Sequence, residues 1–379
     1  MSRVWLKFVL NKIFYATLAV LFFLLPLQAR WIFREVPLYE WGTLSVYGVE
    51  ILGWVVILLG LLRYRYREAE PPFGRRLSLL FLLPLFALSS ILWAPDKAVA
   101  LQVAVRLLEG TLLFFVTRYT LHVTRYKILW AFLAGATLQA GLGIYQFLSQ
   151  SSFASTILGM ALHDPQALGT AVVEFGDERW LRAYGGLPHP NVLGGYLVVA
   201  LAVLIYIWQK GQPKDSPWLR TVLWTTMPIL ITGIFFSFSR AAWIGAVIVM
   251  VYWTIQVFRH SERSKESLAH ASTHIRVRSL VTLGMTILYV VLLTILYRPL
   301  VTARLFPESR LEVKSRVERA QGVREAWQII KAHPLVGVGI GNYTQVLLQL
   351  RPSQSLYAYQ PVHNVPLLVW AELGMVGLA

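Results

Sequence analysis

Residues 221–258, TVLWTTMPILITGIFFSFSRAAWIGAVIVMVYWTIQVF, contain a single charged side chain, Arg240. As one helix this run would extend about 57 Å, at roughly 1.5 Å per residue, whereas the hydrocarbon core of a bilayer is about 30 Å thick. The run therefore predicts two membrane spans joined by a turn near residues 237–240. Arg240 is expected either at one membrane face or in a polar cavity beneath it.

The composition of the whole chain predicts a protein that crosses the membrane many times. Of the 379 residues, 56% are hydrophobic and only 14% are charged, whereas soluble domains carry about 25% charged residues. The net charge of +16 favours anionic lipid headgroups and phosphorylated lipid substrates over nucleic acid as partners in such a protein. The chain has no cysteine, which excludes disulfides, thiolate metal sites and cysteine nucleophiles.

Hydropathy places nine candidate spans and the start of a tenth, and so predicts an all-α polytopic transmembrane bundle. The N-terminal apolar run is interpreted as a first span and not as a signal peptide, because no clear small-residue cleavage site follows it. The candidate spans cover residues 13–29, 42–62, 77–94, 101–117, 128–148, 191–208, 221–237, 241–258 and 279–297, and the tenth begins near residue 364. The predicted segments are five spans in 1–148, a loop at 149–190, four spans in 191–297, a helical loop at 298–363 and part of a span at 364–379.

The distribution of basic residues predicts the orientation of these spans. With a cytoplasmic N-terminus, the inner loops carry nineteen Lys and Arg and the short outer loops carry six, so the positive-inside rule selects this orientation. Residues 298–363 carry nine more, but this segment is longer than the loops of up to about 60 residues to which the rule applies. Arg240 and the loops 149–190 and 298–363 are therefore expected on the outer face. A basic site on that face is expected to meet phosphate already attached to lipid, with a polyprenyl diphosphate as the first candidate.

Within the second loop, the stretch LEVKSRVERAQGVREAWQIIKAHP predicts a helix that ends at Pro334. Its apolar stripe contains Arg316 and Arg324, whereas Glu318 and Glu325 fall on the opposite face. Two interpretations remain open: the arginine stems snorkel along apolar neighbours, or the guanidinium groups bind a diphosphate bidentately. The predicted stripe consists of Val313, Val317, Ala320, Val323, Trp327 and Ile330.

The motif RAYGGLPHPNVLGGYL, residues 182–197, leads from the first outer loop into the sixth predicted span. Asn191 follows His189-Pro190 and is predicted to be the N-cap of that helix. Arg182 and His189 are not explained by capping, and they add a cation and a titratable ring near the level of Arg240. All three residues are candidates for binding the substrate.

A similar motif, PVHNVPLLVWAELG at residues 361–374, enters the tenth predicted span through His363 and Asn364. His363 is a candidate catalytic residue because this span begins on the outer face, where the arginines are expected to converge. Glu372 lies nine residues deeper and is predicted to be a buried partner or a channel group, since a carboxylate inside the membrane is costly without one. In the fourth span, Arg106 and Glu109 are predicted to form a structural ion pair.

The glycine-rich stretch PLVGVGIGNY, residues 334–343, lacks the features of a Walker or a dinucleotide-binding loop and predicts a tight turn against the membrane. The sequence also contains no HExxH motif and no paired aspartates, so neither a metal nor another cofactor is predicted. The charge of a diphosphate would then be balanced by arginine side chains, for which the candidates are Arg182, Arg240, Arg316 and Arg324.

Four stretches in this order, RAYGGLPHPNVLGGYL, SFSRAAW, VREAWQIIKAHPLVGVGIGNY and HNVPLLVWAELGMVG, together resemble the O-antigen ligase family, which shares a superfamily with the Wzy-type O-antigen polymerases. In that family the last motif is a His followed by ten residues and a Gly, and His363 and Gly374 match this spacing. The resemblance covers roughly residues 180–379. Members usually continue for further spans beyond this motif, so the resemblance implies that C-terminal spans are missing here.

The resemblance implies a GT-C-like, metal-independent, inverting glycosyltransferase of the bacterial inner membrane. Such an enzyme takes a glycan from undecaprenyl diphosphate on the periplasmic face and joins it to a sugar of lipid A-core. Arg182, Arg240 and Arg324 would bind the diphosphate, with Arg316 as a less certain addition, and His363 would orient or deprotonate the acceptor hydroxyl. Asn364 belongs to the candidate substrate-binding residues. The implied partners are the undecaprenyl-diphosphate-linked donor, the glycan acceptor and membrane lipids, without nucleic acid or a cofactor.

Other functions remain open at this stage. The same motifs occur in Wzy-type polymerases and in protein O-oligosaccharyltransferases, so the acceptor cannot be read from them. A polysaccharide or lipid transporter is an alternative from another class, but it would favour repeated halves with broken helices, and the sequence shows no such symmetry. A non-catalytic scaffold would not explain why arginines and a histidine gather at one membrane face.

Overall fold

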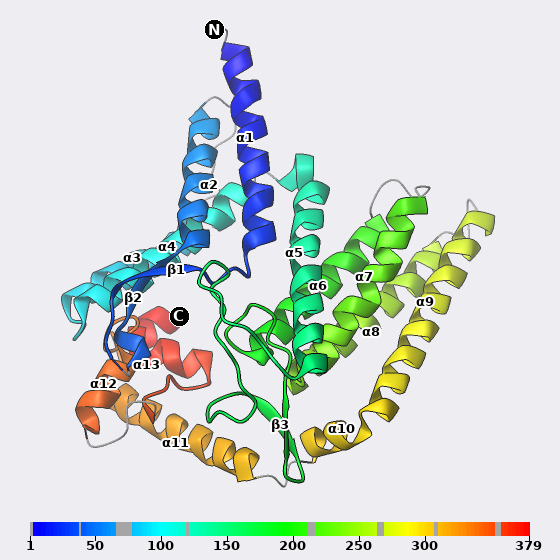
Figure 1. Ribbon diagram of the computed structural model, residues 1–379. Helices are drawn as coiled ribbons and strands as arrows, with labels where there is room; N and C mark the ends of the chain where they lie inside the picture. Colours follow the sequence, from blue (N-terminus) through cyan, green and yellow to red (C-terminus); the bar gives the residue numbers. More distant parts are fainter. Residues whose placement is uncertain are drawn as a thin grey trace. The chain divides into compact units, whose positions relative to one another are not determined.

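The structure is a computed structural model that describes residues 3–37, 39–65, 78–118, 121–210, 217–263, 269–306, 310–352 and 358–379. It is mostly helical (Figure 1). Its contacts divide the chain into two compact units: unit 1 comprises Met1–Leu18, Arg30–Thr124 and Arg310–Ala379, and unit 2 comprises Ala19–Ala29 and Arg125–Ser309. Helix α1 (Arg3–Leu24) contributes to both units, and α5 (Leu121–Ser149) belongs mainly to unit 2.

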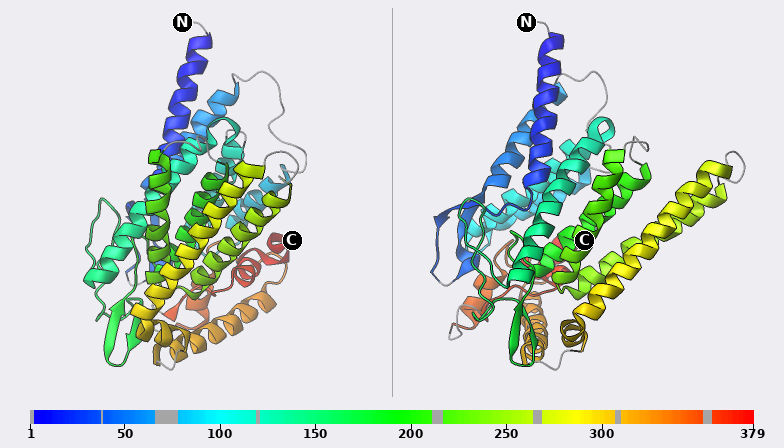
Figure 2. Two further views of the ribbon diagram at one scale, coloured as in Figure 1. Left: turned by 90° about the vertical axis from the view of Figure 1, so that its right-hand side faces the viewer. Right: turned by 45° about the vertical axis from the view of Figure 1, so that its right-hand side comes forward.

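Unit 2 contains the two helices predicted from the long apolar run. The other elements of the unit are α6 (Pro190–Lys210), α7 (Pro217–Phe236), α8 (Arg240–Arg263), α9 (Ala269–Leu296), α10 (Arg298–Leu305), β3 (Val172–Phe175) and β4 (Glu178–Leu181). α7 and α8 are joined by a turn at residues 237–239, so the predicted turn is confirmed. α6 packs against both, and α9 lies beside α8 (Figure 2).

The core of unit 2 lies directly beneath this turn. Phe238 is fully buried in the turn, and its ring contacts Phe147, Phe235 and Trp243 at centroid distances of 5.6–5.8 Å. α6 approaches the turn at Gly194, where a Cβ atom would lie 2.7 Å from the Ala242 Cβ atom. The close packing explains why a small residue is required at this point of α6.

Unit 1 is assembled from both ends of the chain. Its elements are β1 (Arg30–Arg34), η1 (Glu40–Gly42), β2 (Leu44–Tyr47), α2 (Gly48–Arg65), η2 (Ser78–Phe81), α3 (Leu82–Ser89), η3 (Ser90–Leu92), α4 (Lys97–Arg118), α11 (Arg310–Ala332), α12 (Tyr343–Leu350) and α13 (Val365–Leu378). β1 and β2 form an antiparallel hairpin, as do β3 and β4 in unit 2. α13 packs against α11 (Figure 1). The span predicted at 77–94 is divided among η2, α3 and η3 and is not one regular helix.

The glycine-rich stretch forms a tight turn that packs on α13. Gly337, Gly339 and Gly341 have φ angles of 66°, 98° and 73°, a region that favours glycine. The Val338 and Gly339 amides donate to the Ala371 and Glu372 carbonyls, at 3.0 and 2.8 Å. The predicted tight turn is therefore confirmed, and its partner within the unit is α13. Its placement against the membrane remains a prediction.

Four helices in the described part of the chain are long and apolar enough to cross a membrane. They are Trp5–Leu24, Lys97–Arg118, Tyr126–Ser149 and Pro190–Gln209. The bent pair Val281–Leu296 and Arg298–Leu305 raises the number to five if it is one span. These helices indicate a multi-pass membrane protein, whereas the prediction of about ten spans and of a GT-C-like fold remains a prediction.

Helix α11 confirms the predicted helix, and the residues of its predicted apolar stripe differ in burial. Val317 is 60% exposed and Trp327 is 41% exposed, although both belong to the predicted stripe. The buried residues of the helix are Glu325, Ala326, Ile329 and Ile330, and Ile330 also belongs to the predicted stripe. Glu325 is accommodated on this face because it is paired inside the unit: its carboxylate accepts a hydrogen bond from Gln321 and pairs with Arg351 at 2.5 Å.

Candidate functional site

Two arginines donate hydrogen bonds to consecutive carbonyl groups of the turn that precedes α8. Arg182 Nε donates to the Ser237 carbonyl, and Arg304 Nε donates to the Phe238 carbonyl, each at 2.8 Å. Arg240 is the first residue of α8, and its side chain is half-buried. Ser239 precedes it in the N-cap position, and the Ser239 hydroxyl accepts from the Ala242 amide at 3.4 Å. Two arginines thus donate hydrogen bonds to this short turn of unit 2, and a third follows it in sequence.

The structure reverses the roles predicted for His189 and Asn191. α6 begins at Pro190, so His189 holds the N-cap position, and its Nδ1 atom accepts a hydrogen bond from the Asn191 amide at 3.0 Å. Asn191 Oδ1 instead accepts from Arg182 Nη2 at 2.7 Å. The Arg182 side chain is 4% exposed, so this bond and the Ser237 carbonyl satisfy a buried guanidinium.

The loop that carries Arg182 is held by glutamine side chains of α5. Gln146 is fully buried; its Oε1 atom accepts from the Tyr184 and Gly185 amides, and its Nε2 atom donates to the Gly185 carbonyl. Gln139 accepts from the Gly186 amide at 2.6 Å. Sequence analysis did not identify these glutamines. A polar side chain repeated along one face of an apolar helix is the signal that could have found them.

His163 is another residue of this loop that sequence analysis missed. Its ring stacks on the Tyr184 ring with a centroid distance of 3.7 Å. Its amide donates to the Ser152 hydroxyl at 2.6 Å. Burial lowers the pKa of His163 below its ordinary value, because the charged form loses hydration. The Tyr184 ring also lies 6.4 Å from the His189 ring, so it connects both histidines with the Arg182 loop.

In unit 1, His363 lies immediately before α13. Asn364 is the N-cap of this helix, and its side chain accepts from the Leu367 amide at 3.1 Å. His363 and Asn364 are both exposed. Val362 lies against Gly322 of α11, where a Cβ atom would be 3.9 Å from the Val362 Cα atom. The segment before His363 is therefore packed on the helix that carries Arg324.

Of the two candidate arginines of α11, only Arg324 has a described side chain. Arg324 is exposed, on the same side of α11 as Val317 and Trp327. The backbone of Arg316 belongs to α11, but its side chain lies outside the described part of the chain. Trp327 makes an edge contact with Trp370 of α13 at 5.4 Å. The outward side of α11 therefore combines a cation with apolar side chains.

Glu372 has the buried partners that its position predicted. Its two carboxylate oxygens accept from the Gly341 amide at 2.9 Å and from the Tyr343 amide at 3.3 Å. Glu372 thereby joins the glycine turn to α13. Of the two interpretations of Glu372, a buried partner or a channel group, the structure supports the buried partner. The ion pair predicted between Arg106 and Glu109 is replaced, because Arg106 Nε pairs with Glu50 of α2 at 2.5 Å.

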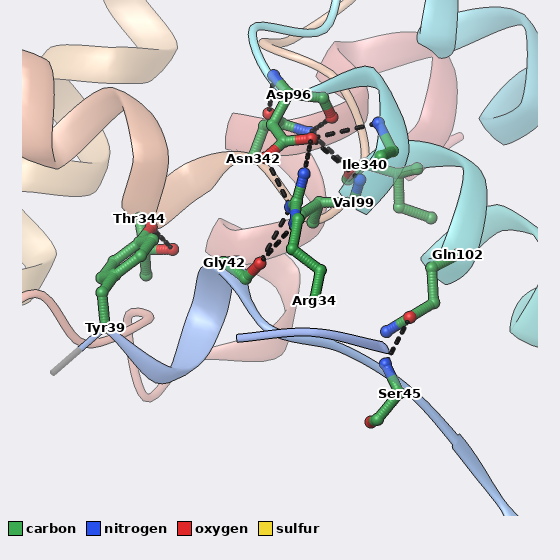
Figure 3. A network of polar contacts seen from close by, with 11 residues as sticks. Arg34, Tyr39, Gly42, Ser45, Asp96, Val99, Gln102, Ile340, Asn342 and Thr344 are labelled. Atoms are coloured by element: carbon green, nitrogen blue, oxygen red, sulfur yellow. Dashed lines mark hydrogen bonds and ion pairs between the residues drawn. The ribbon is translucent and has the colours of Figure 1, made fainter. Parts of the chain in front are cut away.

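A polar network fixes the other side of the glycine turn (Figure 3). Arg34 binds the Asp96 carboxylate at 2.7 and 3.3 Å and also donates to the Gly42 carbonyl. Asn342 is fully buried, and its Oδ1 atom accepts from the Asp96 amide at 2.7 Å. Burial alone would raise the pKa of Asp96. The hydrogen bond from Arg34, two backbone amides and the charge of Arg34 together lower it by more, so the pKa of Asp96 lies below its ordinary value.

The predicted site residues fall into two groups, one in each unit. Arg182, His189, Asn191 and Arg240 meet at the α7–α8 turn of unit 2. Arg316, Arg324, His363 and Asn364 belong to unit 1. The convergence of the two groups on one substrate remains a prediction. Among the described residues, no group of three or more His, Asp or Glu side chains is arranged to hold a metal ion.

Comparison with known proteins supports the motif-based assignment. Residues 225–379 match the family model of O-antigen ligase, so the resemblance seen in the motifs is confirmed for this part of the chain. A General O-oligosaccharyltransferase of Acinetobacter baylyi (strain ATCC 33305 / BD413 / ADP1) is 24% identical over 199 residues. The aligned region covers 50% of this chain and 32% of that protein, about a third of its length. No solved structure matches the chain.

Proposed function

Because residues 225–379 carry an O-antigen ligase domain, we propose that the protein is a glycosyltransferase that moves a glycan from undecaprenyl diphosphate to an acceptor sugar hydroxyl, with lipid A-core as the first candidate. The reaction is proposed to take place on the periplasmic face of the bacterial inner membrane. The observation that carries the proposal is the α7–α8 turn of unit 2. Arg182 donates a hydrogen bond to this turn and Arg240 follows it, and a basic site at the end of an apolar helix pair suits a lipid-linked phosphate.

The diphosphate is the leaving group of this reaction. The bond between the anomeric carbon and the diphosphate oxygen breaks, and the electron pair leaves with the diphosphate. Negative charge therefore increases on the phosphate oxygens in the transition state. Arg182, Arg240 and Arg324 are proposed to stabilise this charge through bidentate hydrogen bonds. The hydrogen bonds of Arg182 to Ser237 and Asn191 hold its guanidinium in advance, which avoids reorganisation during the reaction.

His363 is proposed to act on the acceptor. The acceptor oxygen forms the new bond to the anomeric carbon from the side opposite the diphosphate, so the configuration inverts, and its proton passes to the His363 imidazole. A histidine suits this step because its unperturbed pKa, about 6.5, lies close to neutrality. Asn364 caps α13 and so fixes the point at which the chain enters that helix. His189 and Asn191 hold the Arg182 loop and complete the proposed donor site.

The acceptor separates the leading proposal from its closest alternative. The relative from Acinetobacter baylyi is named a General O-oligosaccharyltransferase, a name that does not specify the acceptor. The second candidate reaction is transfer to a protein acceptor. A Wzy-type polymerase would use a second lipid-linked glycan as acceptor. These reactions share the proposed donor chemistry, so they differ in the group that is glycosylated and not in the roles of the arginines.

The test is glycan transfer by the purified full chain in lipid nanodiscs. The donor is undecaprenyl-diphosphate-linked oligosaccharide, and separate reactions contain lipid A-core, an acceptor protein or no added acceptor. We expect transfer to lipid A-core, with a loss of at least 100-fold for Arg240→Ala and His363→Ala while both variants remain folded. Lys331→Ala is the matched control, because this exposed basic residue of α11 has no proposed role.

The outcomes separate the candidate functions. Transfer only to protein would identify an oligosaccharyltransferase, and lengthening of the donor glycan without another acceptor would identify a polymerase. Movement of lipid-linked glycan across vesicles without a new glycosidic bond would replace the proposal by a transporter. A wild-type rate for Arg240→Ala would show that this arginine does not stabilise the diphosphate.

A further inference from the structure

Helix α10 delivers an arginine to the proposed donor site that no motif indicated. The axis of the chain bends by 89° between Val281–Leu296 and Arg298–Leu305, and the bend turns α10 away from α9 (Figure 1). α10 packs on β3, with Leu300 and Val301 buried in the core of unit 2. This placement brings the Arg304 Nε atom to 2.8 Å from the Phe238 carbonyl oxygen.

The turn that accepts this bond has an unfavourable backbone conformation. Phe238 has a φ angle of 45°, a left-handed value that is unfavourable for a residue with a side chain. Such a conformation persists only where its surroundings enforce it. The buried Phe238 ring supplies part of this constraint through its aromatic contacts. The backbone of the turn is also constrained, because the Ser237 and Phe238 carbonyl groups accept hydrogen bonds from arginine side chains.

The two carbonyl bonds determine how α8 begins. Arg182 Nε binds the Ser237 carbonyl and Arg304 Nε binds the next carbonyl, that of Phe238. Arg240 follows two residues later as the first residue of α8. A change in the orientation of either peptide group would rotate the start of this helix. The direction of the Arg240 side chain therefore depends on both bonds.

We infer that Arg304 is a positioning residue, which holds the turn at residues 237–239 so that Arg240 is directed at the diphosphate of the donor. The inference rests on the proposed function, because it takes Arg240 as a ligand of that diphosphate. Arg304 acts through a hydrogen bond to a carbonyl group, not through its charge on the substrate.

Three substitutions separate a role in hydrogen bonding from a role in charge. Arg304→Lys keeps both a charge and an N–H donor, Arg304→Gln keeps a donor without a charge, and Arg304→Met keeps only the apolar stem. We expect Arg304→Met to lower kcat about 10- to 30-fold with less than a 3-fold change in the KM for the donor. Arg304→Lys and Arg304→Gln are expected to retain at least a third of the wild-type kcat. The control is Arg298→Met, which changes an exposed arginine at the start of the same helix.

A second readout does not depend on transfer. The chain contains no cysteine, so an Ala241→Cys variant places a single thiol beside Arg240, at an exposed position in the first turn of α8. The rate of alkylation of this thiol by a water-soluble maleimide reports the geometry of the turn. We expect Arg304→Met to change this rate at least 3-fold, whereas Arg304→Gln and Arg298→Met leave it within 2-fold of the Ala241→Cys protein.

Each result bears on the inference. If Arg304→Gln loses as much kcat as Arg304→Met while Arg304→Lys is active, Arg304 acts by charge and the positioning role is wrong. Wild-type kcat and an unchanged alkylation rate in Arg304→Met would also overturn it, although the proposed transfer would stand. If the wild-type chain transfers no glycan but the alkylation rates change as expected, the positioning of the turn stands and the proposed function fails.

Discussion

At the scale of single residues, the proposed donor site of unit 2 depends on hydrogen bonds of His189 and Asn191 that differ from those expected from the sequence. Asn is a favoured N-cap, so Asn191 was expected to cap α6. Pro190 is the first residue of the helix, which places the cap at His189. Proline is over-represented at the first helical position, and this preference was the available signal. The side-chain Oδ1 atom of Asn191 instead accepts a hydrogen bond from Arg182.

The Asn191–Arg182 contact predicts that two substitutions of Asn191 affect stability and transfer differently. Asn191→Leu removes the acceptor of a buried guanidinium and should destabilise the protein by about 1–3 kcal/mol. Asn191→Asp keeps an acceptor but neutralises the charge of Arg182, so thermal stability should be retained while transfer falls at least 10-fold. Melting temperature and initial transfer rate, measured on the same preparations, distinguish the two effects. Wild-type transfer by Asn191→Asp would contradict a role for the Arg182 charge.

His163 predicts a pH dependence of the loop 149–190. The pKa of its folded state is lowered by burial, whereas an unfolded histidine has a pKa of about 6.5. The folded loop therefore binds fewer protons, so its stability is fully present above pH 6.5 and decreases as the pH falls through and below that value. Hydrogen exchange of residues 149–190, corrected for the intrinsic rate, should show weaker protection at pH 5 than at pH 7. The same change in His163→Phe would show that another group is responsible.

At the scale of elements, the α7–α8 turn could be predicted from length alone, whereas the buried face of α11 could not. An uncharged run that is too long for one bilayer must contain a turn, and this argument needs no partner. The face of α11 depends on Arg351, which lies 26 residues from Glu325 and satisfies its carboxylate. Periodicity identified Val317 and Trp327 as apolar neighbours but could not show whether that face meets the core or its surroundings.

The glycine turn on α13 predicts a position at which alanine cannot be accommodated. Gly374 interrupts α13 with a φ angle of 67°, and a Cβ atom there would lie 2.1 Å from the Leu335 carbonyl oxygen. Gly374→Ala should therefore lower the free energy of unfolding by about 1–3 kcal/mol or more. Gly110→Ala of α4 is the matched control, because a Cβ atom there meets nothing within 4 Å. It should be neutral or stabilising by up to about 1 kcal/mol.

Thermal unfolding in a mild detergent, with residual transfer measured at a temperature where both variants are folded, tests this prediction. A melting temperature for Gly374→Ala equal to that of Gly110→Ala would mean that the turn relaxes without cost. The Gly at this spacing after His363 would then need an explanation other than packing against Leu335.

At the scale of the whole molecule, unit 1 is held together by contacts between distant residues that cannot be predicted from a single sequence. Its polar network joins Arg34 near the N-terminus, Asp96 before α4 and Asn342 in the glycine turn (Figure 3). These contacts span up to 246 residues of sequence. Local periodicity and hydropathy carry no information about such distant pairs. The motifs were therefore recognised one by one, while the contacts that position them came from the structure.

The number of spans is the prediction on which the placement of the whole site depends. α8 has an apolar part, Arg240–Gln256, that is shorter than the four long candidate spans. Its 17 residues would extend about 25 Å, which is at the lower limit for crossing a bilayer. If it does cross, Arg240 lies on the outer face and the predicted loop 259–278 lies on the inner face. Because the chain has no cysteine, single thiols at Ala241 and Ala269 can be labelled without background.

We expect a membrane-impermeant maleimide to label Ala241→Cys in intact cells and Ala269→Cys only after permeabilisation. Ala167→Cys, at an exposed position of the loop 149–190, is the control for the outer side. Labelling of the thiols at 241 and 269 from the same side would mean that α8 does not cross the membrane. Because the donor is proposed to be bound from the periplasmic face, labelling at 241 from the inner side alone would place the arginines away from that donor and require a different substrate.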